Sequence, residues 1–135
     1  MLGEMYSEEI GQVTGSRVLP AENGAPRLEI TFQASGTILG LHSTDMGTYI
    51  GTLHADGTMR GEGQGVIMTE DGGVATWFGQ GVGKPTGRGT GVSWRGALYY
   101  RTQSESLARL NSIAGVFEFE VDESQKTEGK LFEWK

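Results

Sequence analysis

The 135-residue sequence has no cysteine, only 3 prolines and no long apolar run. The lack of cysteine excludes disulfides, thiolate metal sites and a cysteine nucleophile. A membrane-spanning helix needs about 20 mostly apolar residues, which the chain nowhere offers. Residues 1–10 also lack the positive start and apolar core of a secretory signal. We therefore expect a soluble, cytoplasmic protein that forms one domain over residues 1–135.

Positive charge is also scarce, with 11 Lys and Arg against 17 Asp and Glu and a net charge of −6. Nucleic-acid binding normally requires a basic face that neutralises phosphates. The basic residues are scattered along this chain, apart from a small cluster at Arg88, Arg95 and Arg101. We expect neither a nucleic-acid partner nor a membrane partner.

Recognisable catalytic motifs are missing as well. The sequence has no Gly-x-Ser-x-Gly elbow and no Gly-Lys-Ser/Thr phosphate loop. His42 and His54 lie in different segments; they could join Asp45 or Asp56 at a metal, but their spacing supports no specific site. We predict no metal site and no cofactor, and the sequence leaves open whether the protein is an enzyme.

Glycine, in contrast, is abundant, with 23 residues. The sequence also contains 3 tryptophans, 4 tyrosines and 5 phenylalanines. A disordered glycine-rich chain would lack such aromatics. Hydrophobic and polar residues alternate with the period of two that is typical of β-strands, and Asn-Gly and Asp-Gly pairs mark hairpin turns between the runs. The predicted strands cover residues 10–19, 27–40, 41–53, 58–69, 74–84, 87–101, 113–121 and 129–134.

One segment departs from this alternation. Residues 104–110 begin with Ser104, which can cap a helix, and place Leu107 and Leu110 at helical spacing. We expect a short helix that covers one end of the sheet. Eight consecutive strands joined by short turns favour an all-β, eight-stranded antiparallel up-and-down barrel of the calycin type, since closure removes exposed edges. The alternative is a two-sheet sandwich.

Three glycine triplets at alternate positions stand out: Gly61, Gly63 and Gly65; Gly79, Gly81 and Gly83; Gly87, Gly89 and Gly91. Each triplet would lie on one face of its strand. Glycine inside a strand costs about 0.5–1 kcal/mol relative to alanine. Strong coiling, close backbone approach or another surface packed on the glycines would have to compensate.

The face that carries the glycines follows from the sixth strand. There Trp94, Leu98 and Tyr100 share one parity and are expected inside, which places the preceding glycines outside. The same choice turns Arg60, Glu62, Gln64 and Gln80 inward and leaves a flat glycine patch on the outer surface, where it could join copies of the chain into a homo-oligomer. The opposite choice turns Met59, Ile67 and Trp77 inward together with the glycines.

The candidate ligand-binding set follows from the first choice, because buried polar groups need partners that a ligand could supply. It consists of Arg60, Glu62, Gln64, Trp77, Gln80, Trp94 and Tyr100. The alternative interpretation leaves the polar members in solvent and the aromatic members as core. We predict no catalytic residue.

The C-terminal third has a characteristic order: the Ser104–Asn111 segment, a Gly-Val-Phe-Glu-Phe-Glu-Val strand at residues 115–121, and a final aromatic strand at residues 129–134. This order resembles small uncharacterised bacterial barrels that are similar to allene oxide cyclase and lipocalin-like barrels. The resemblance implies an eight-stranded barrel, and cyclases of this shape bind an apolar molecule inside. With the mixed polar and aromatic interior, the barrel pattern favours a protein that binds a small apolar or amphipathic molecule. The resemblance implies a cofactor-free isomerase or cyclase as one alternative, and the glycine patch suggests a non-enzymatic oligomer-forming protein as another.

Overall fold

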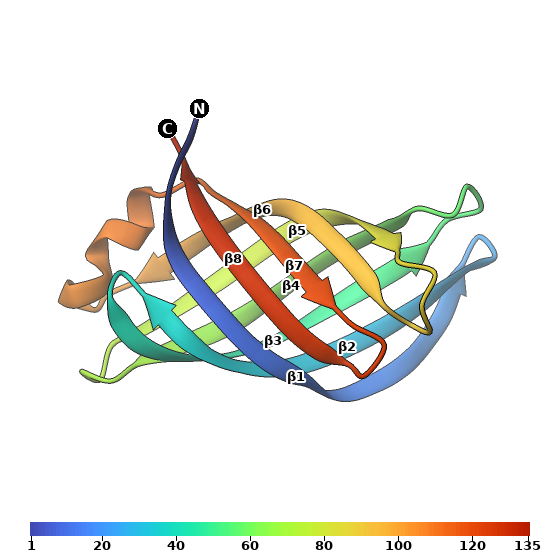
Figure 1. The fold of residues 1–135 in the computed structure, drawn as a ribbon, viewed down its shortest axis with the longest axis horizontal. Coiled ribbons are helices and arrows are strands. Elements are labelled where there is room, and N and C mark those ends of the chain that lie inside the picture. The colour runs from blue at the N-terminus through green and yellow to red at the C-terminus, as the bar shows by residue number, and fades with distance from the viewer.

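The computed structural model describes residues 1–135 as a closed barrel of eight antiparallel strands in sequence order. β1 pairs with β2 and also with β8, so the sheet has no free edge (Figure 1). This confirms the predicted fold. The strands are β1 (Leu2–Glu22), β2 (Ala25–Ile38), β3 (Leu41–Leu53), β4 (Met59–Thr69), β5 (Val74–Pro85), β6 (Val92–Thr102), β7 (Gly115–Val121) and β8 (Lys126–Trp134).

The hairpins use the residues that their backbone geometry requires. Asn23 and Gly24 have φ values of 50° and 82°, so both occupy the left-handed region that a tight two-residue turn needs. Gly57 and Gly72 also have positive φ and follow Asp56 and Asp71, as predicted. Asp56 accepts hydrogen bonds from the backbone N–H and the hydroxyl of Thr58, which hold its turn closed.

The predicted sixth strand is too long at its start. It begins at Val92, and the third glycine triplet lies in the preceding loop, where Gly87 and Gly89 have φ values of 82° and 53°. These two glycines therefore serve loop conformations that other residues rarely adopt. Their parity carries no information about the faces of the strands.

The first choice of glycine face, which rested on that parity, is wrong. Arg60, Glu62, Gln64 and Gln80 lie on the outer face with exposed side chains, whereas the glycines of β4 and β5 face the interior. The interior instead receives Ile67 and Trp77, as in the second choice, and Trp94 and Tyr100 are inside as predicted.

Two indole rings occupy the space that the glycines leave. A Cβ added to Gly65 would lie 2.5 Å from Cζ2 of Trp77, and one added to Gly61 would lie 2.7 Å from Cζ3 of Trp94. Real Cβ atoms do not approach other atoms this closely. These glycines form a surface, the glycine bed, on which the two tryptophan rings pack. Burial of the rings offsets the stability that glycine costs inside a strand.

The short helix η1 (Glu105–Ser112) lies at one end of the barrel (Figure 1). Leu107 and Leu110 are fully buried, so the predicted cover is confirmed. The side chain of Ser104 does not cap the helix; its hydroxyl instead accepts a hydrogen bond from the backbone N–H of Val74 on β5. Asn111 fastens the other side through the backbone N–H and carbonyl of Thr102.

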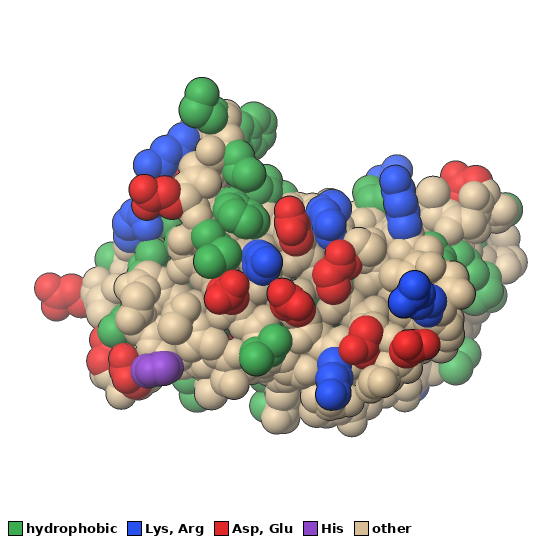
Figure 2. Space-filling view, viewed as in Figure 1, with side chains coloured by type: hydrophobic (Ala, Val, Ile, Leu, Met, Phe, Trp, Pro, Cys, Tyr) green, Lys and Arg blue, Asp and Glu red, His purple; other side chains and the backbone are tan.

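The outer surface mixes charges of both signs. Figure 2 shows acidic and basic side chains interspersed on the face that carries β1, β7 and β8, where Arg95 pairs with Glu120 and Lys130 with Glu128. The outer face of β5 and β6 also carries Phe78, which packs on Tyr99 with ring centroids 5.6 Å apart. The structure contains no helix that is both long and apolar enough to cross a membrane.

The glycine bed yields a stability prediction. We expect Gly65→Ala to lower the free energy of unfolding by about 1–3 kcal/mol, because the added methyl group overlaps the indole of Trp77. Urea denaturation measures this value. Gly15→Ala is the matched control: Gly15 lies in β1 with no atom within 4 Å of an added Cβ, so its stability should change little or rise. Equal effects of both substitutions would contradict the role assigned to Gly65.

Candidate functional site

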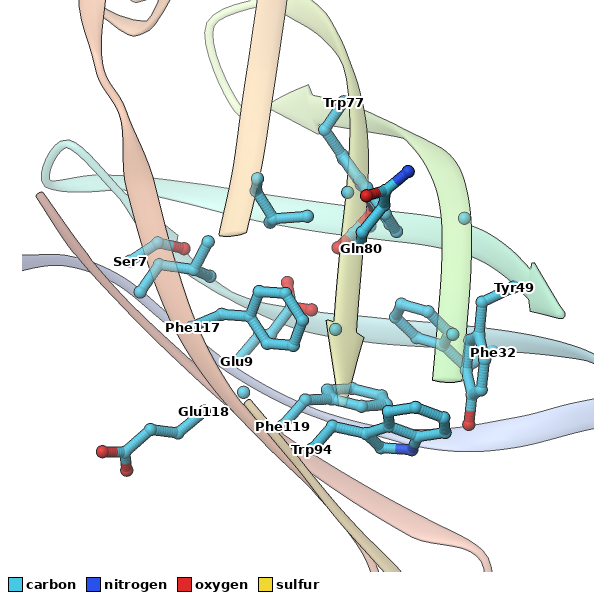
Figure 3. A pocket seen from close by; sticks show the side chains of 18 of the residues that line it. Ser7, Glu9, Phe32, Tyr49, Trp77, Gln80, Trp94, Phe117, Glu118 and Phe119 are labelled. Atoms are coloured by element: carbon cyan, nitrogen blue, oxygen red, sulfur yellow. Dashed lines mark hydrogen bonds between the residues drawn. The ribbon is translucent and has the colours of Figure 1, made fainter. Parts of the chain in front are cut away.

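A cavity of about 80 Å³ lies inside the barrel between the two tryptophans. Five strands, β2, β3, β5, β6 and β7, contribute aromatic rings to its walls, and the close view in Figure 3 shows several of these rings around the space. The rings are those of Phe32, Tyr49, Trp77, Trp94, Tyr100, Phe117 and Phe119. Glycine positions such as Gly63, Gly79 and Gly129 also line the cavity, so the space remains because no side chain projects from these positions.

The aromatic rings form a connected cluster. Phe119 lies 5.0 Å from Phe32 and 6.0 Å from Tyr49, measured between ring centroids, and Tyr49 meets Trp94 edge-on at 5.7 Å. Such edge-to-face and tilted pairs each stabilise a core by about 0.5–1.5 kcal/mol beyond area burial. The wall of the cavity is therefore packed and ordered.

Two carboxylic acids face this apolar space. Glu9 of β1 and Asp45 of β3 are each only 7% exposed, and both line the cavity. The indole Nε1–H of Trp77 donates a hydrogen bond to Oδ1 of Asp45 at 2.8 Å, and the Glu9 and Asp45 carboxyls lie close enough to shift each other's pKa. No lysine or arginine lines the cavity, so nothing basic neutralises the pair.

Local sequence explains how Glu9 reaches the interior. Its neighbours across the sheet are Gly36 on β2 and Gly129 on β8, and a Cβ added to Gly129 would lie 3.3 Å from Cγ of Glu9. The absence of side chains on both flanks gives the Glu9 side chain room to extend along the wall. Asp45 lies between Ala34 on β2 and Ile67 on β4.

Burial sets the protonation of the pair. Desolvation raises the pKa of Glu9 well above its usual value, and the neighbouring Asp45 carboxyl raises it further. Desolvation also raises the pKa of Asp45, whereas the neighbouring Glu9 carboxyl and the hydrogen bond from Trp77 lower it. Burial therefore favours the protonated form of both acids, and the hydrogen bond from Trp77 makes Asp45 the more acidic member.

Two tyrosines extend the polar cluster. The hydroxyls of Tyr6 and Tyr100 are 2.9 Å apart inside the barrel. Burial raises the pKa of Tyr6 to about 12 and raises that of Tyr100 well above its ordinary value, where the charges of Asp45 and Glu9 add to the effect. Both phenols are therefore neutral throughout the physiological range.

Trp94 contributes a hydrogen-bond donor to the cavity. Its ring is only 4% exposed, it lines the cavity, and its Nε1–H makes no hydrogen bond of normal geometry, although the Tyr49 hydroxyl lies close enough for Trp94 to lower the pKa of Tyr49. Burial has the larger effect and raises the pKa of the Tyr49 phenol to about 12. A buried donor without an acceptor costs about 1–3 kcal/mol, and an acceptor atom on a bound molecule would recover it.

Of the seven predicted site residues, the structure brings Trp77, Trp94 and Tyr100 together at the cavity. Glu62 and Gln80 reach only its outer rim, and Arg60 and Gln64 lie outside it. The two carboxylic acids were missed. Asp45 shares its parity with Gly47 and Tyr49, so a correct choice of the glycine face would have placed it inside. No group of three or more His, Asp or Glu side chains is arranged to hold a metal ion.

No protein-family model matches the chain, and no curated protein sequence matches it. Solved structures match it closely in fold. A protein of unknown function from Clostridium acetobutylicum has a TM-score of 0.82 at 12% identity and covers 98% of both chains. A β-barrel-like protein from Acinetobacter baumannii has a TM-score of 0.83 at 11% identity, over 100% of this chain and 96% of the other.

A third structure belongs to an enzyme from Penicillium herquei, with a TM-score of 0.66 and 19% identity over 98% of this chain and 96% of that one. At these identities the likenesses establish the small β-barrel fold alone. None of these three is described as an allene oxide cyclase or a lipocalin, so that part of the resemblance stays a prediction.

The protonated pair yields a pH prediction. A folded-state pKa above the unfolded value means that the folded protein binds more protons, so stability falls as pH rises. We expect the free energy of unfolding to decrease as the pH rises from about 4.5 to the raised pKa of Glu9. The expected slope is at most about 1.4 kcal/mol per pH unit for the one proton involved. Denaturant melts at pH 4–9 measure this slope.

Glu9→Gln should flatten the slope, because the amide cannot ionise and can still donate to Asp45. Glu118→Gln, which removes a carboxylate that points away from the barrel (Figure 3), should leave it unchanged. A slope that persists in full after Glu9→Gln would show that other groups carry it.

Proposed function

We propose that the barrel binds a compact, neutral small molecule with an apolar body. The observation that carries this proposal is the cavity itself, a space inside the barrel with an aromatic wall and few polar groups, which is the usual form of a small-molecule site. The resemblance of the sequence to allene oxide cyclase-like and lipocalin-like barrels implies the same function.

The size of the cavity limits the ligand. An enclosed site needs about 10–15 Å³ per water molecule, and a cavity of about 150 Å³ accommodates benzene. The 80 Å³ observed here suits a molecule smaller than benzene when the walls stay fixed. A ring-sized ligand would need Leu98 or Phe117, which are only partly buried, to move outward.

The charge of the cavity limits the ligand further. The Glu9–Asp45 pair is acidic, and the lining contains no cation to receive a carboxylate or phosphate. An anionic ligand would therefore bring an uncompensated charge into an apolar space, which is costly. A neutral molecule with a carbonyl or ether oxygen avoids this cost and offers an acceptor to Trp94.

This proposal predicts how binding responds to substitution. Acetone, which is smaller than benzene, should bind to the wild type, and Trp94→Phe should weaken binding by about 2–12-fold, the equivalent of one neutral hydrogen bond of about 0.5–1.5 kcal/mol. Ligand-observed NMR titration measures the dissociation constants, and thermal melting checks that each variant is folded.

Gln64→Ala is the control, since Gln64 is exposed on the outer face of β4, does not line the cavity and should leave the affinity unchanged. The proposal fails if acetone does not bind to the wild type. The assignment to the interior fails if Gln64→Ala weakens binding as much as Trp94→Phe does.

A further inference from the structure

Ligand binding alone does not account for the Glu9–Asp45 pair. Apolar side chains of similar size would fill these positions without the cost of burying carboxyl groups. The two acids come from strands that are not neighbours, β1 and β3, yet both are buried, face the same cavity and shift each other's pKa. The buried Nε1–H of Trp94 lines the same space and makes no hydrogen bond of normal geometry, although the Tyr49 phenol lies beside it, so an acceptor atom of a bound molecule would complete it.

We propose that Glu9 and Asp45 form a cofactor-free acid–base pair that interconverts the keto and enol forms of a neutral ketone bound in the cavity. This inference rests on the proposed binding function and adds to it a substrate class and a reaction.

The pair is arranged to act as acid and base at once. In this scheme Glu9 holds the proton, whereas Asp45, the more acidic member, is ionised and accepts a hydrogen bond from Trp77. When the ketone is bound, Glu9 gives its proton to the carbonyl oxygen while Asp45 removes a proton from the α-carbon. The electron pair of the broken C–H bond becomes the C=C bond of the enol, and the carbonyl π-electrons form the new O–H bond.

The step balances without any further reactant. The pair holds one proton before the step and one after it, now on Asp45 instead of Glu9, and its charge is unchanged. The reverse step returns the proton to the same carbon or, in a conjugated enol, to another one, which moves a double bond. A pair of carboxyl groups whose environments separate their proton affinities is a common basis for such acid–base chemistry.

Trp77 is a positioning residue in this scheme. Its indole lies on Gly47 and Gly65, and its Nε1–H holds one oxygen of Asp45 at 2.8 Å. This donor favours ionisation of Asp45 over ionisation of Glu9, which decides which acid carries the proton. Tyr6 and Tyr100, the remaining titratable groups beside the pair, stay neutral in the working range.

The test is the exchange of α-protons for deuterium in D₂O, followed by ¹H NMR with acetone and cyclopentanone as probes. Enol formation removes an α-proton, and the pair returns a deuteron acquired from solvent. We expect the wild type to accelerate exchange at least 10²-fold over buffer, the lower end of general acid–base catalysis. Glu9→Gln and Asp45→Asn should lose this acceleration, and Glu118→Gln should keep it.

Binding is measured on the same samples, so the two proposals fail separately. A ketone that binds to the wild type without faster exchange overturns the acid–base pair and leaves the binding function intact. A ketone that does not bind overturns both. Full exchange activity in folded Glu9→Gln and Asp45→Asn also overturns the pair.

The wild type alone provides a second test that does not depend on variant folding. The exchange rate should rise with pH as Asp45 ionises and fall again as Glu9 loses its proton, which gives a bell-shaped profile for the pair. Trp77→Phe should shift the rising limb to higher pH, because Asp45 loses a donor that favours its ionised form. A flat profile in the wild type contradicts the proposal.

Discussion

The packing of two indole rings on glycine is the interaction on which this barrel depends. Gly47 and Gly65 receive Trp77, and Gly61 and Gly83 receive Trp94. Each glycine lowers the stability of its strand. The buried aromatic rings offset this loss, because a buried ring stabilises the fold far more than the methyl groups that it replaces. Rings that pack against the wall also leave the centre open, whereas ordinary side chains at these four glycines, on the three strands β3, β4 and β5, would extend into the barrel.

The same packing determines the chemistry of the site. Trp77 can hold Asp45 only because its ring is fixed in the glycine bed, so a structural feature of β3 and β4 orients an ionisable group. A buried carboxylate with one strong donor and one carboxylic acid partner is satisfied without a cation. The site therefore combines buried acids with an apolar wall, and this combination suits neutral molecules and proton transfer.

The alternation of β2, β3 and β7 and the Asn-Gly and Asp-Gly turns were sufficient to predict the number of strands, their order and the closed barrel. The start of β1 was predicted wrongly: the strand begins at Leu2 and not at residue 10, so Glu9 lay outside the predicted strand. Leu107 and Leu110 were sufficient to predict the helical cover. The same alternation could not predict which face of β4 and β5 points inward, because glycine has no side chain whose polarity would indicate a face. The glycines that seemed to extend β6 form a loop instead, and this displaced Arg60, Glu62, Gln64 and Gln80 into the predicted interior.

The burial of Glu9 could not be predicted from the hydrophobic pattern, for a different reason. In β1 the polarity is inverted: Glu9 is 7% exposed, whereas the adjacent Ile10 is 67% exposed. A shift of one residue would bury Ile10, which is worth about 1.5–3 kcal/mol, and release the acid to solvent. The register with β2 and β8 opposes that shift, since Ser7 shares the parity of Glu9 and is also inside, and the irregularity between Met5 and Ser7 lets Tyr6 point inward as well. Such a local violation of the hydrophobic pattern persists where function compensates for it, and here the buried acid is the group that meets Asp45 across the cavity.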